Sequence, residues 1–150
     1  MIQGSCLCGG VQFQIARILD LFELCHCRRC RKATGSAFAA SFAARQKDVQ
    51  ILRGTDLIAT YEAPIVESPP AYRTSFCRRC GSPVPDPNPG RGWFKIDAGV
   101  LDDDLGMKPQ RHIHVDRKAP WFEITDDLPR FEKRAHIELR ALLETLREEG

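Results

Sequence analysis

The chain has 150 residues, of which 43% are hydrophobic and 28% are charged, a size and balance typical of one globular domain with a hydrophobic core. Its net charge of +2 argues against nucleic-acid binding, since domains that bind nucleic acid are usually far more basic. No stretch has the length of a membrane span, and the first residues lack the basic and apolar regions of a signal peptide. We therefore expect a single domain over residues 1–150 that does not enter a membrane.

The number of cysteines indicates the compartment. Seven is an odd count in a chain without an export signal, which argues against a disulfide framework and for a reducing, cytoplasmic environment. Metal binding is the better use for these thiols.

Two of the cysteines lie near the N-terminus. Cys6 and Cys8 stand among glycines, and glycine allows the tight backbone that brings two sulfur atoms to one ion. The alternation of apolar and polar residues over 11–15 then predicts a half-buried strand, and residues 19–24 predict a second one.

The second strand leads into residues 25–32, around which the sequence is organised. Cys25, Cys27 and Cys30 stand within six residues, together with four fixed positive charges. Three protein ligands and an exchangeable position are typical of catalytic zinc, whereas four protein ligands are typical of structural zinc. We interpret this stretch as the reactive centre. The alternative is that His26 or another cysteine fills the fourth position, which would make the site structural.

The middle of the chain is predicted to form short strands. Their ranges are 38–42, 48–52, 57–61 and 72–76. The second and third of these should pair as a hairpin across a turn at 53–56. A helical turn over residues 31–35 should end at Gly35, and the proline-rich residues 63–70 should form an extended connection.

Cys77 and Cys80 form a Cys-x-x-Cys pair followed by glycine. This is the geometry of zinc knuckles, in which one turn directs both sulfur atoms at an ion. A thioredoxin-like redox pair is the competing interpretation, and it requires a helix after the cysteines. Four prolines between residues 83 and 89 argue against that helix.

The last third of the chain is predicted to contain three strands and a helix. Their ranges are 93–99, 111–115 and 121–124 for the strands and about 131–148 for the helix. His112 and His114 should lie on one face of their strand, where they could complete a metal site or face a substrate pocket, but a lone exposed or hydrogen-bonded role is the more common use of histidine. The helix is amphipathic, and we expect it to cover the sheet rather than to recruit a partner.

The seven cysteines divide into a set of four and a set of three. The four are Cys6, Cys8, Cys77 and Cys80, which make one tetrahedral set and leave Cys25, Cys27 and Cys30. We therefore hypothesise two zinc ions per chain, one closed and one with an open position. The cations near the open site should lower thiol pKa values and attract an acidic ligand, although a solvated surface is the alternative for any one of them.

Four motifs carry a resemblance to a known family. They are Gly-Ser-Cys-x-Cys-Gly-Gly-Val at 4–11, Cys-His-Cys-Arg-Arg-Cys-Arg-Lys at 25–32, Phe-Cys-Arg-Arg-Cys-Gly at 76–81 and His-Ile-x-Val-x-x-Lys-Ala-Pro-Trp-Phe-Glu-Ile at 112–124. Together they resemble the GFA family, the relatives of the glutathione-dependent formaldehyde-activating enzyme and of the centromere protein V-like proteins. The resemblance covers about residues 3–131, with all seven cysteines in order.

The resemblance implies a fold, a pair of metal sites and an activity. The fold is mainly β, a β-tent of antiparallel sheets with zinc knuckles, to which this chain adds the C-terminal α-helix. The implied structural zinc lies on Cys6, Cys8, Cys77 and Cys80, and the implied catalytic zinc lies on Cys25, Cys27 and Cys30. The implied activity is that of a carbon–sulfur lyase, which adds a thiol such as glutathione to formaldehyde or a related small carbonyl compound, or cleaves such adducts.

The resemblance indicates the substrate contacts less directly than the metal ligands. Arg28, Arg29 and Lys32 are candidates for holding a carboxylate, and His112 or His114 for transferring a proton. The chain is short beside the founding enzyme, and its tail beyond residue 131 lies outside the shared motifs, so the exact substrate does not carry over. Neither the natural substrate nor the oligomeric state follows from the sequence.

A second hypothesis belongs to another class of protein. The chain would be a non-catalytic zinc-binding module that contacts a protein or a nucleic acid through its sheet surface and terminal helix. A fourth protein ligand at the central zinc would favour this hypothesis. The small net charge argues against its nucleic-acid form.

Overall fold

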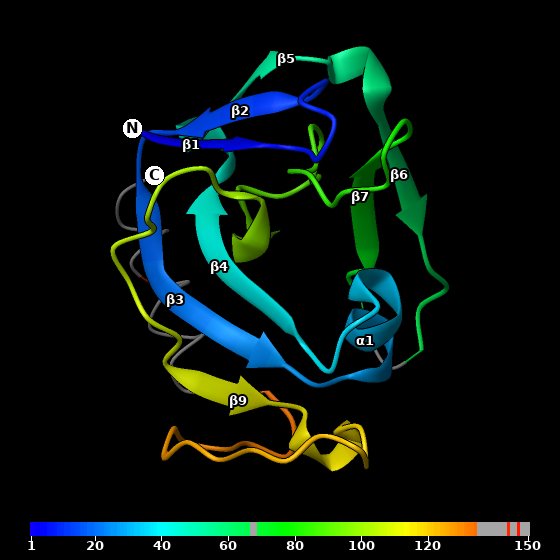
Figure 1. The fold of residues 1–150 in the computed structure, drawn as a ribbon, viewed down its shortest axis with the longest axis vertical. Coiled ribbons are helices and arrows are strands. Elements are labelled where there is room, and N and C mark those ends of the chain that lie inside the picture. The colour runs from blue at the N-terminus through cyan, green and yellow to red at the C-terminus, as the bar shows by residue number, and fades with distance from the viewer. Residues whose placement is uncertain (67–68, 135–143, 145–146, 148–150) are drawn as a thin grey trace. The chain divides into compact units, whose positions relative to one another are not determined.

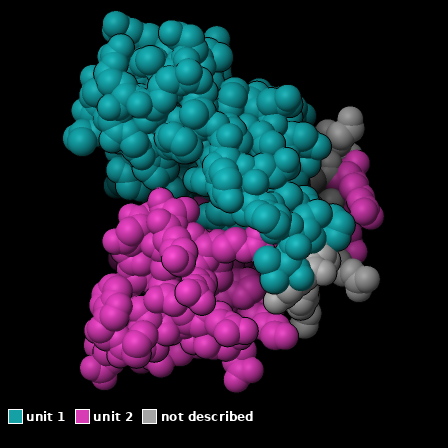
Figure 2. Space-filling view, turned by 90° about the vertical axis from the view of Figure 1, so that its right-hand side faces the viewer, with its two compact units in different colours: residues 1–18, 42–106 teal, residues 19–41, 107–150 magenta. Residues whose placement is uncertain are grey.

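The structure is a computed structural model that describes residues 1–66, 69–134, 144 and 147. The chain forms two compact units, which Figure 2 shows in different colours. Unit 1 consists of residues 1–18 and 42–106, and unit 2 consists of residues 19–41 and 107–150. The single domain over residues 1–150 stays a prediction.

Unit 1 is built from short antiparallel strands (Figure 1). The strands are β1 (Ile2–Ser5), β2 (Gln12–Ile15), β5 (Val49–Arg53), β6 (Ile58–Glu62), β7 (Arg73–Cys77) and β8 (Trp93–Asp97). They form a three-stranded sheet in the order β1-β2-β5 and a two-stranded sheet of β6 and β7. In a further sheet β8 lies next to β4 (Ala39–Arg45), a strand that begins in unit 2.

The core of unit 1 follows from the alternation of residues in β2. Phe13 and Ile15 are fully buried, while Gln12 and Gln14 face outward, so the half-buried strand predicted here is confirmed. Gly4, opposite Phe13 in β1, makes room for the ring, because a Cβ atom at Gly4 would lie 2.2 Å from Phe13 Cζ. The small residue in β1 therefore permits the large one in β2.

Unit 2 contains β3 (Ile18–Cys25, of which Ile18 lies in unit 1), β9 (Arg111–Ile113) and α1 (Arg28–Thr34). Strands β3 and β9 pair in parallel, with Glu23 opposite Arg111. The two buried side chains form an ion pair at 3.9 Å, which favours this register. The sheets are thus mixed rather than purely antiparallel. The described residues also contain four 3-10 turns, at Gln46–Asp48, Thr55–Leu57, Ala98–Val100 and Val115–Arg117.

The predicted helical turn that ends at Gly35 is confirmed and is longer than expected. Helix α1 begins at Arg28 and ends at Gly35, whose φ of 64° is the left-handed conformation favoured by glycine. The Gly35 N–H donates to the Arg31 carbonyl and closes the last turn.

Three sequence predictions are wrong, and each has a local cause. The hairpin of 48–52 with 57–61 does not form, because β5 pairs with β2 and β6 pairs with β7; Gly54 at φ 81° and the following 3-10 turn redirect the chain. Residues 121–124 are not a strand, since Lys118 Nζ donates to the Phe122 carbonyl within that segment. Strand β9 ends at Ile113, and His114 has a φ of 54°, so the two histidines do not share a strand face.

The remaining expectations concern the fold class, the C-terminal helix and the absence of a membrane span. The mainly β fold is confirmed, and strand β1 was not foreseen. Most of the helix predicted over residues 131–148 falls outside the described residues. Of those that are described, residues 131–134 carry no helical conformation, whereas 144 and 147 are helical. The β-tent arrangement stays a prediction. Among the described residues, no helix combines the length and the apolar character needed to cross a membrane.

Candidate metal centres

Four cysteines of unit 1 gather their sulfur atoms in one place. The ligand atoms of Cys6, Cys8, Cys77 and Cys80 all lie within 4.8 Å of one another, with 3.5 Å between Cys6 and Cys8 and 3.9 Å between Cys8 and Cys77. Four sulfur atoms at tetrahedral positions about 2.3 Å from a zinc ion would be separated by roughly 3.8 Å. The four-cysteine cluster therefore has the dimensions of a closed metal site.

Two tight turns bring these sulfur atoms together. In the first, the Val11 N–H donates to Cys6 Sγ at 3.2 Å, which stabilises negative charge on the sulfur atom. In the second, the Gly81 N–H donates to the Cys77 carbonyl at 2.7 Å, and Gly81 has a φ of 77°. Cys6 and Cys77 are also buried members of an apolar cluster with Val11, Ile58 and Val84. The turn geometry and the apolar surroundings together fix the directions of the thiols.

Three cysteines of unit 2 form the second group. Cys25 ends β3, Cys27 is the N-cap of α1, and Cys30 lies in the first turn of that helix. Their ligand atoms lie within 4.8 Å of one another. The Cys30 N–H donates to Cys27 Sγ at 3.3 Å, so the sulfur atom takes the role that a Ser or Asp oxygen usually has at a helix start.

Hydrogen bonds within the three-cysteine cluster place the negative charge on one sulfur atom. Those from the Cys25 and Cys30 side chains lower the pKa of Cys27 to about 2. The same hydrogen bond to Cys27 raises the pKa of Cys25 to about 11, and the bonds to Cys25 and Cys27 also raise the pKa of Cys30. Because metal ligation requires thiolates, ion binding at this cluster would release protons from Cys25 and Cys30.

The described part of the chain offers no fourth Cys, His, Asp or Glu ligand to this group. His26, the sequence-based alternative, is fully buried and makes a different contact. Its Nε2 lies 2.7 Å from Nδ1 of His112. The alternative in which His26 closes the site therefore finds no support in the geometry.

His26 belongs to a hydrogen-bonded chain that ends at the surface of unit 2. His112 Nε2 lies 3.0 and 3.1 Å from the two carboxylate oxygens of Asp126, so Nε2 carries the proton and Nδ1 of a neutral His112 ring accepts from His26 Nε2–H. The rings of Phe38 and Phe122 lie 5.3 and 6.1 Å from the His26 ring. We call these linked residues, Asp126, His112 and His26, the histidine chain.

The pKa values of His26 and Asp126, the two ends of the histidine chain, are both lowered. Burial is the main cause that lowers the pKa of His26 to about 4, so this ring is neutral at pH 7. The hydrogen bond from His112 lowers the pKa of Asp126. His26 Nδ1 is buried without a hydrogen-bond partner among the described residues, so its capacity to form a hydrogen bond is unused there.

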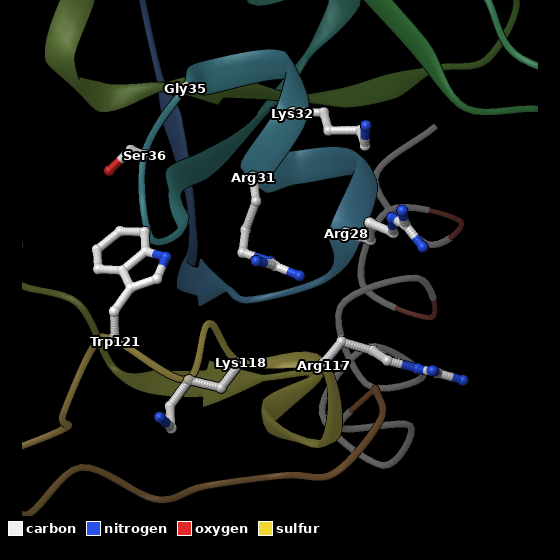
Figure 3. Close-up of a pocket in the computed structure, with 8 residues that line it drawn as sticks. All are labelled: Arg28, Arg31, Lys32, Gly35, Ser36, Arg117, Lys118 and Trp121. Atoms are coloured by element: carbon white, nitrogen blue, oxygen red, sulfur yellow. The ribbon is translucent and has the colours of Figure 1, made fainter.

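A cavity of about 580 Å³ lies between α1 and residues 117–121 of unit 2 (Figure 3). Arg28 and Lys32, two of the predicted substrate contacts, line it, whereas Arg29 does not. Arg31, one of the four cations expected to attract an acidic ligand, also lines it, as do Arg117, Lys118 and Trp121, for which the sequence predicted no substrate contact. We call this cavity the basic pocket.

Comparison with known proteins gives consistent matches. Residues 1–117 match the family model described as glutathione-dependent formaldehyde-activating enzyme, GFA. A protein of Halomonas elongata named "Putative glutathione-dependent formaldehyde-activating enzyme" is 30% identical over 131 residues, which cover 83% of this chain and 81% of that protein. A crystal structure of a Rhodobacter sphaeroides protein is similar in fold, with a TM-score of 0.51 and 23% identity over 71% of this chain and 97% of the other.

Proposed function

This chain belongs to the glutathione-dependent formaldehyde-activating enzyme family, and on that premise we propose that it is a zinc-dependent enzyme of the carbon–sulfur lyase type. It adds a thiol such as glutathione to formaldehyde or a related small carbonyl compound, or cleaves such adducts. The observation that carries the proposal is the three-cysteine cluster, in which the described residues supply three ligands and no fourth. That number of ligands is typical of catalytic zinc.

The two clusters would take different roles. Cys6, Cys8, Cys77 and Cys80 would hold a structural zinc ion, while Cys25, Cys27 and Cys30 would hold the catalytic one. Zinc bound with an open position supplies a Lewis acid, which favours the thiolate form of a bound thiol or polarises a carbonyl oxygen. The all-sulfur donor sets and their spacing fit this ion.

The reaction requires one carbon–sulfur bond to form and one proton to move. A carbon–sulfur bond forms between the thiol and the carbonyl carbon, the carbon–oxygen double bond becomes a single bond, and the thiol proton ends on that oxygen. The histidine chain is our candidate for moving this proton, since His26 lies between two cluster cysteines and keeps Nδ1 without a partner among the described residues. Asp126 holds the His112 ring in place through two contacts.

The other predicted contacts stay proposals. Arg28, Arg29 and Lys32 would attract the carboxylates of a peptide-like thiol, and two of the three line the basic pocket. Hydrogen bonds from Cys25 and Cys30 are the main causes that lower the pKa of Cys27, and the charge of His114 adds a smaller effect in the same direction. This supports a role for His114 near the cluster rather than in the histidine chain.

The test combines metal content with activity. Wild-type protein should contain two zinc ions and should accelerate the exchange between ¹³C-formaldehyde and its S-hydroxymethyl adduct with glutathione, measured by exchange NMR. Cys27→Ser should keep one zinc ion and lose the acceleration while it stays folded, because serine is a good N-cap and preserves the start of α1.

The proposal has clear points of failure. It is wrong if the zinc-loaded wild type accelerates neither formation nor cleavage of thiol adducts, or if Cys27→Ser is fully active. A cobalt-substituted protein provides a second measurement, since a thiol that enters the open position should change the visible spectrum. An unchanged spectrum at saturating glutathione would favour the non-catalytic module instead.

A further inference from the structure

The basic pocket concentrates positive charge without a compensating acid. Five of its eight lining residues are Arg or Lys and none is Asp or Glu. On α1, Arg28 lies three residues before Arg31 and four residues before Lys32. Like charges at this spacing occupy one helix face and destabilise the helix by about 0.2–0.5 kcal/mol per pair. A bound anion would turn this repulsion into attraction.

Arg31 provides an independent sign of a missing acceptor. Its Nε is buried and has no hydrogen-bond partner among the described residues. A buried donor without a partner is costly in a folded protein. Figure 3 shows the Arg31 side chain extending from α1 toward the segment that carries Arg117 and Lys118. An anionic oxygen atom in the pocket would satisfy this nitrogen.

The two remaining cations have partners that hold them in place. Arg117 lies 3.7 Å from Asp116, and Lys118 Nζ donates to the carbonyls of Ala119 and Phe122. Lys118 thereby fixes the turn that leads to Trp121. The charges of this segment contribute to the potential in the pocket, while Arg28, Arg31 and Lys32 of α1 have no carboxylate partner among the described residues.

Trp121 adds a flat apolar surface to the same cavity. Trp121 is 72% exposed, although most of the surface of a tryptophan is usually buried in proteins. Exposed aromatic rings next to cations are typical of sites that stack a planar ring while neighbouring cations hold a phosphate.

We propose that the basic pocket binds a phosphate monoester with a planar ring, a ligand of the nucleoside monophosphate class. The phosphate contacts Arg31 with Arg28 and Lys32, and the ring stacks on Trp121. A phosphate monoester carries about −1.5 to −2 charges and three acceptor oxygen atoms at pH 7, so it matches several neighbouring cations better than one carboxylate does. Guanidinium groups also bind phosphate through paired hydrogen bonds. The site shares Arg28 and Lys32 with the carboxylate contacts proposed above for the thiol substrate, but AMP binding requires no lyase chemistry.

The experiment uses Trp121 as its own reporter. The chain has two tryptophans, and Trp93→Phe leaves Trp121 as the only one. Zinc-loaded Trp93→Phe protein is titrated with AMP, adenosine, inorganic phosphate and glutathione, and fluorescence is followed. We expect saturable quenching by AMP, with tighter binding than that of the other three compounds and a loss of affinity as salt rises.

Matched variants test the assignment of the phosphate. Arg31→Gln should weaken AMP binding roughly tenfold to a hundredfold, the size expected for a charge-assisted hydrogen bond. Arg53→Gln makes the same change at an exposed residue of β5 outside the pocket and should leave the affinity within about twofold. Trp121→Ala, followed by calorimetry, should weaken AMP but not inorganic phosphate.

Several results would overturn the proposal. These are an absence of saturable quenching by AMP, equal affinity for adenosine and AMP, tighter binding of glutathione than of AMP, or unchanged affinity in Arg31→Gln. Repeating the AMP titration in Cys27→Ser separates this proposal from the lyase. AMP binding should persist there, and its loss would mean that the pocket depends on the catalytic ion.

Discussion

His112 is the residue whose replacement tests the histidine chain most directly. It is almost fully buried and contacts His26 at 2.7 Å and Asp126 at 3.0 Å. His112→Phe keeps a ring of similar size and removes both nitrogen atoms. The backbone should tolerate the change, since the N–H and carbonyl groups of residue 112 keep their bonds to Pro129 and Phe131.

The expected loss of stability follows from the burial of the two partners. His26 is fully buried, so its Nε2 would lose its partner where water cannot replace it, at a cost of about 1–3 kcal/mol. Asp126 has a side chain that is 46% exposed, so water can hydrate its carboxylate and the further loss should stay below about 1 kcal/mol. We expect His112→Phe to lower the free energy of unfolding by about 1–4 kcal/mol.

Urea unfolding of the zinc-loaded protein, followed by circular dichroism, measures this loss. Asp126→Asn should cost less than about 1 kcal/mol. In a double-mutant cycle, His26→Phe with His112→Phe should cost less than the sum of the single changes, because the second replacement removes the nitrogen atom that the first left without a partner. A cost below about 0.5 kcal/mol for His112→Phe, or strict additivity in the cycle, would refute the hydrogen-bonded chain.

Three further predictions concern unit 1. Cys77→Ser should prevent stable folding and zinc retention at the four-cysteine cluster, as seen by metal analysis and circular dichroism, because a structural zinc ion contributes on the order of 10 kcal/mol; a folded variant with two ions would contradict the assignment. Gly4→Ala should cost about 1–3 kcal/mol in urea unfolding, since the added methyl group meets the Phe13 ring, whereas Gly92→Ala, with open space around it, should be nearly neutral. Burial raises the pKa of Asp97, so the folded state binds this proton more tightly and the carboxylate opposes folding above that pKa. Asp97→Asn should therefore raise the free energy of unfolding more at pH 7 than at pH 3, below the ordinary pKa of an aspartate, and an equal effect at both would refute the reasoning.

The cysteine partition could be predicted from the sequence because it depends on local spacing. A pair separated by one or two residues in a glycine-rich turn can direct both sulfur atoms only to one place, so Cys6 with Cys8 and Cys77 with Cys80 were each visible as units. That the two pairs share one cluster followed from counting thiols. The alternation around Phe13 predicted its strand for a similarly local reason.

The histidine chain could not be predicted, since its members are brought together by pairing that leaves no local pattern. His26 and His112 are neighbours because Leu24 and His112 occupy the same register position in the parallel strands β3 and β9. Asp126 lies in irregular structure and has no motif around it. The i, i+2 spacing of His112 and His114 was misleading, because the left-handed conformation of His114 ends the strand between them.

Cys27 connects the two chemical features of unit 2 through a single sulfur atom. It is a member of the three-cysteine cluster and also the acceptor that caps α1, the helix whose Arg28, Arg31 and Lys32 form one wall of the basic pocket. Oxidation or alkylation of this thiol would thus remove a metal ligand and loosen the first helical turn in one event. An oxidised preparation would then lose its anion affinity together with its ion, and reducing conditions are a requirement for every titration of this protein.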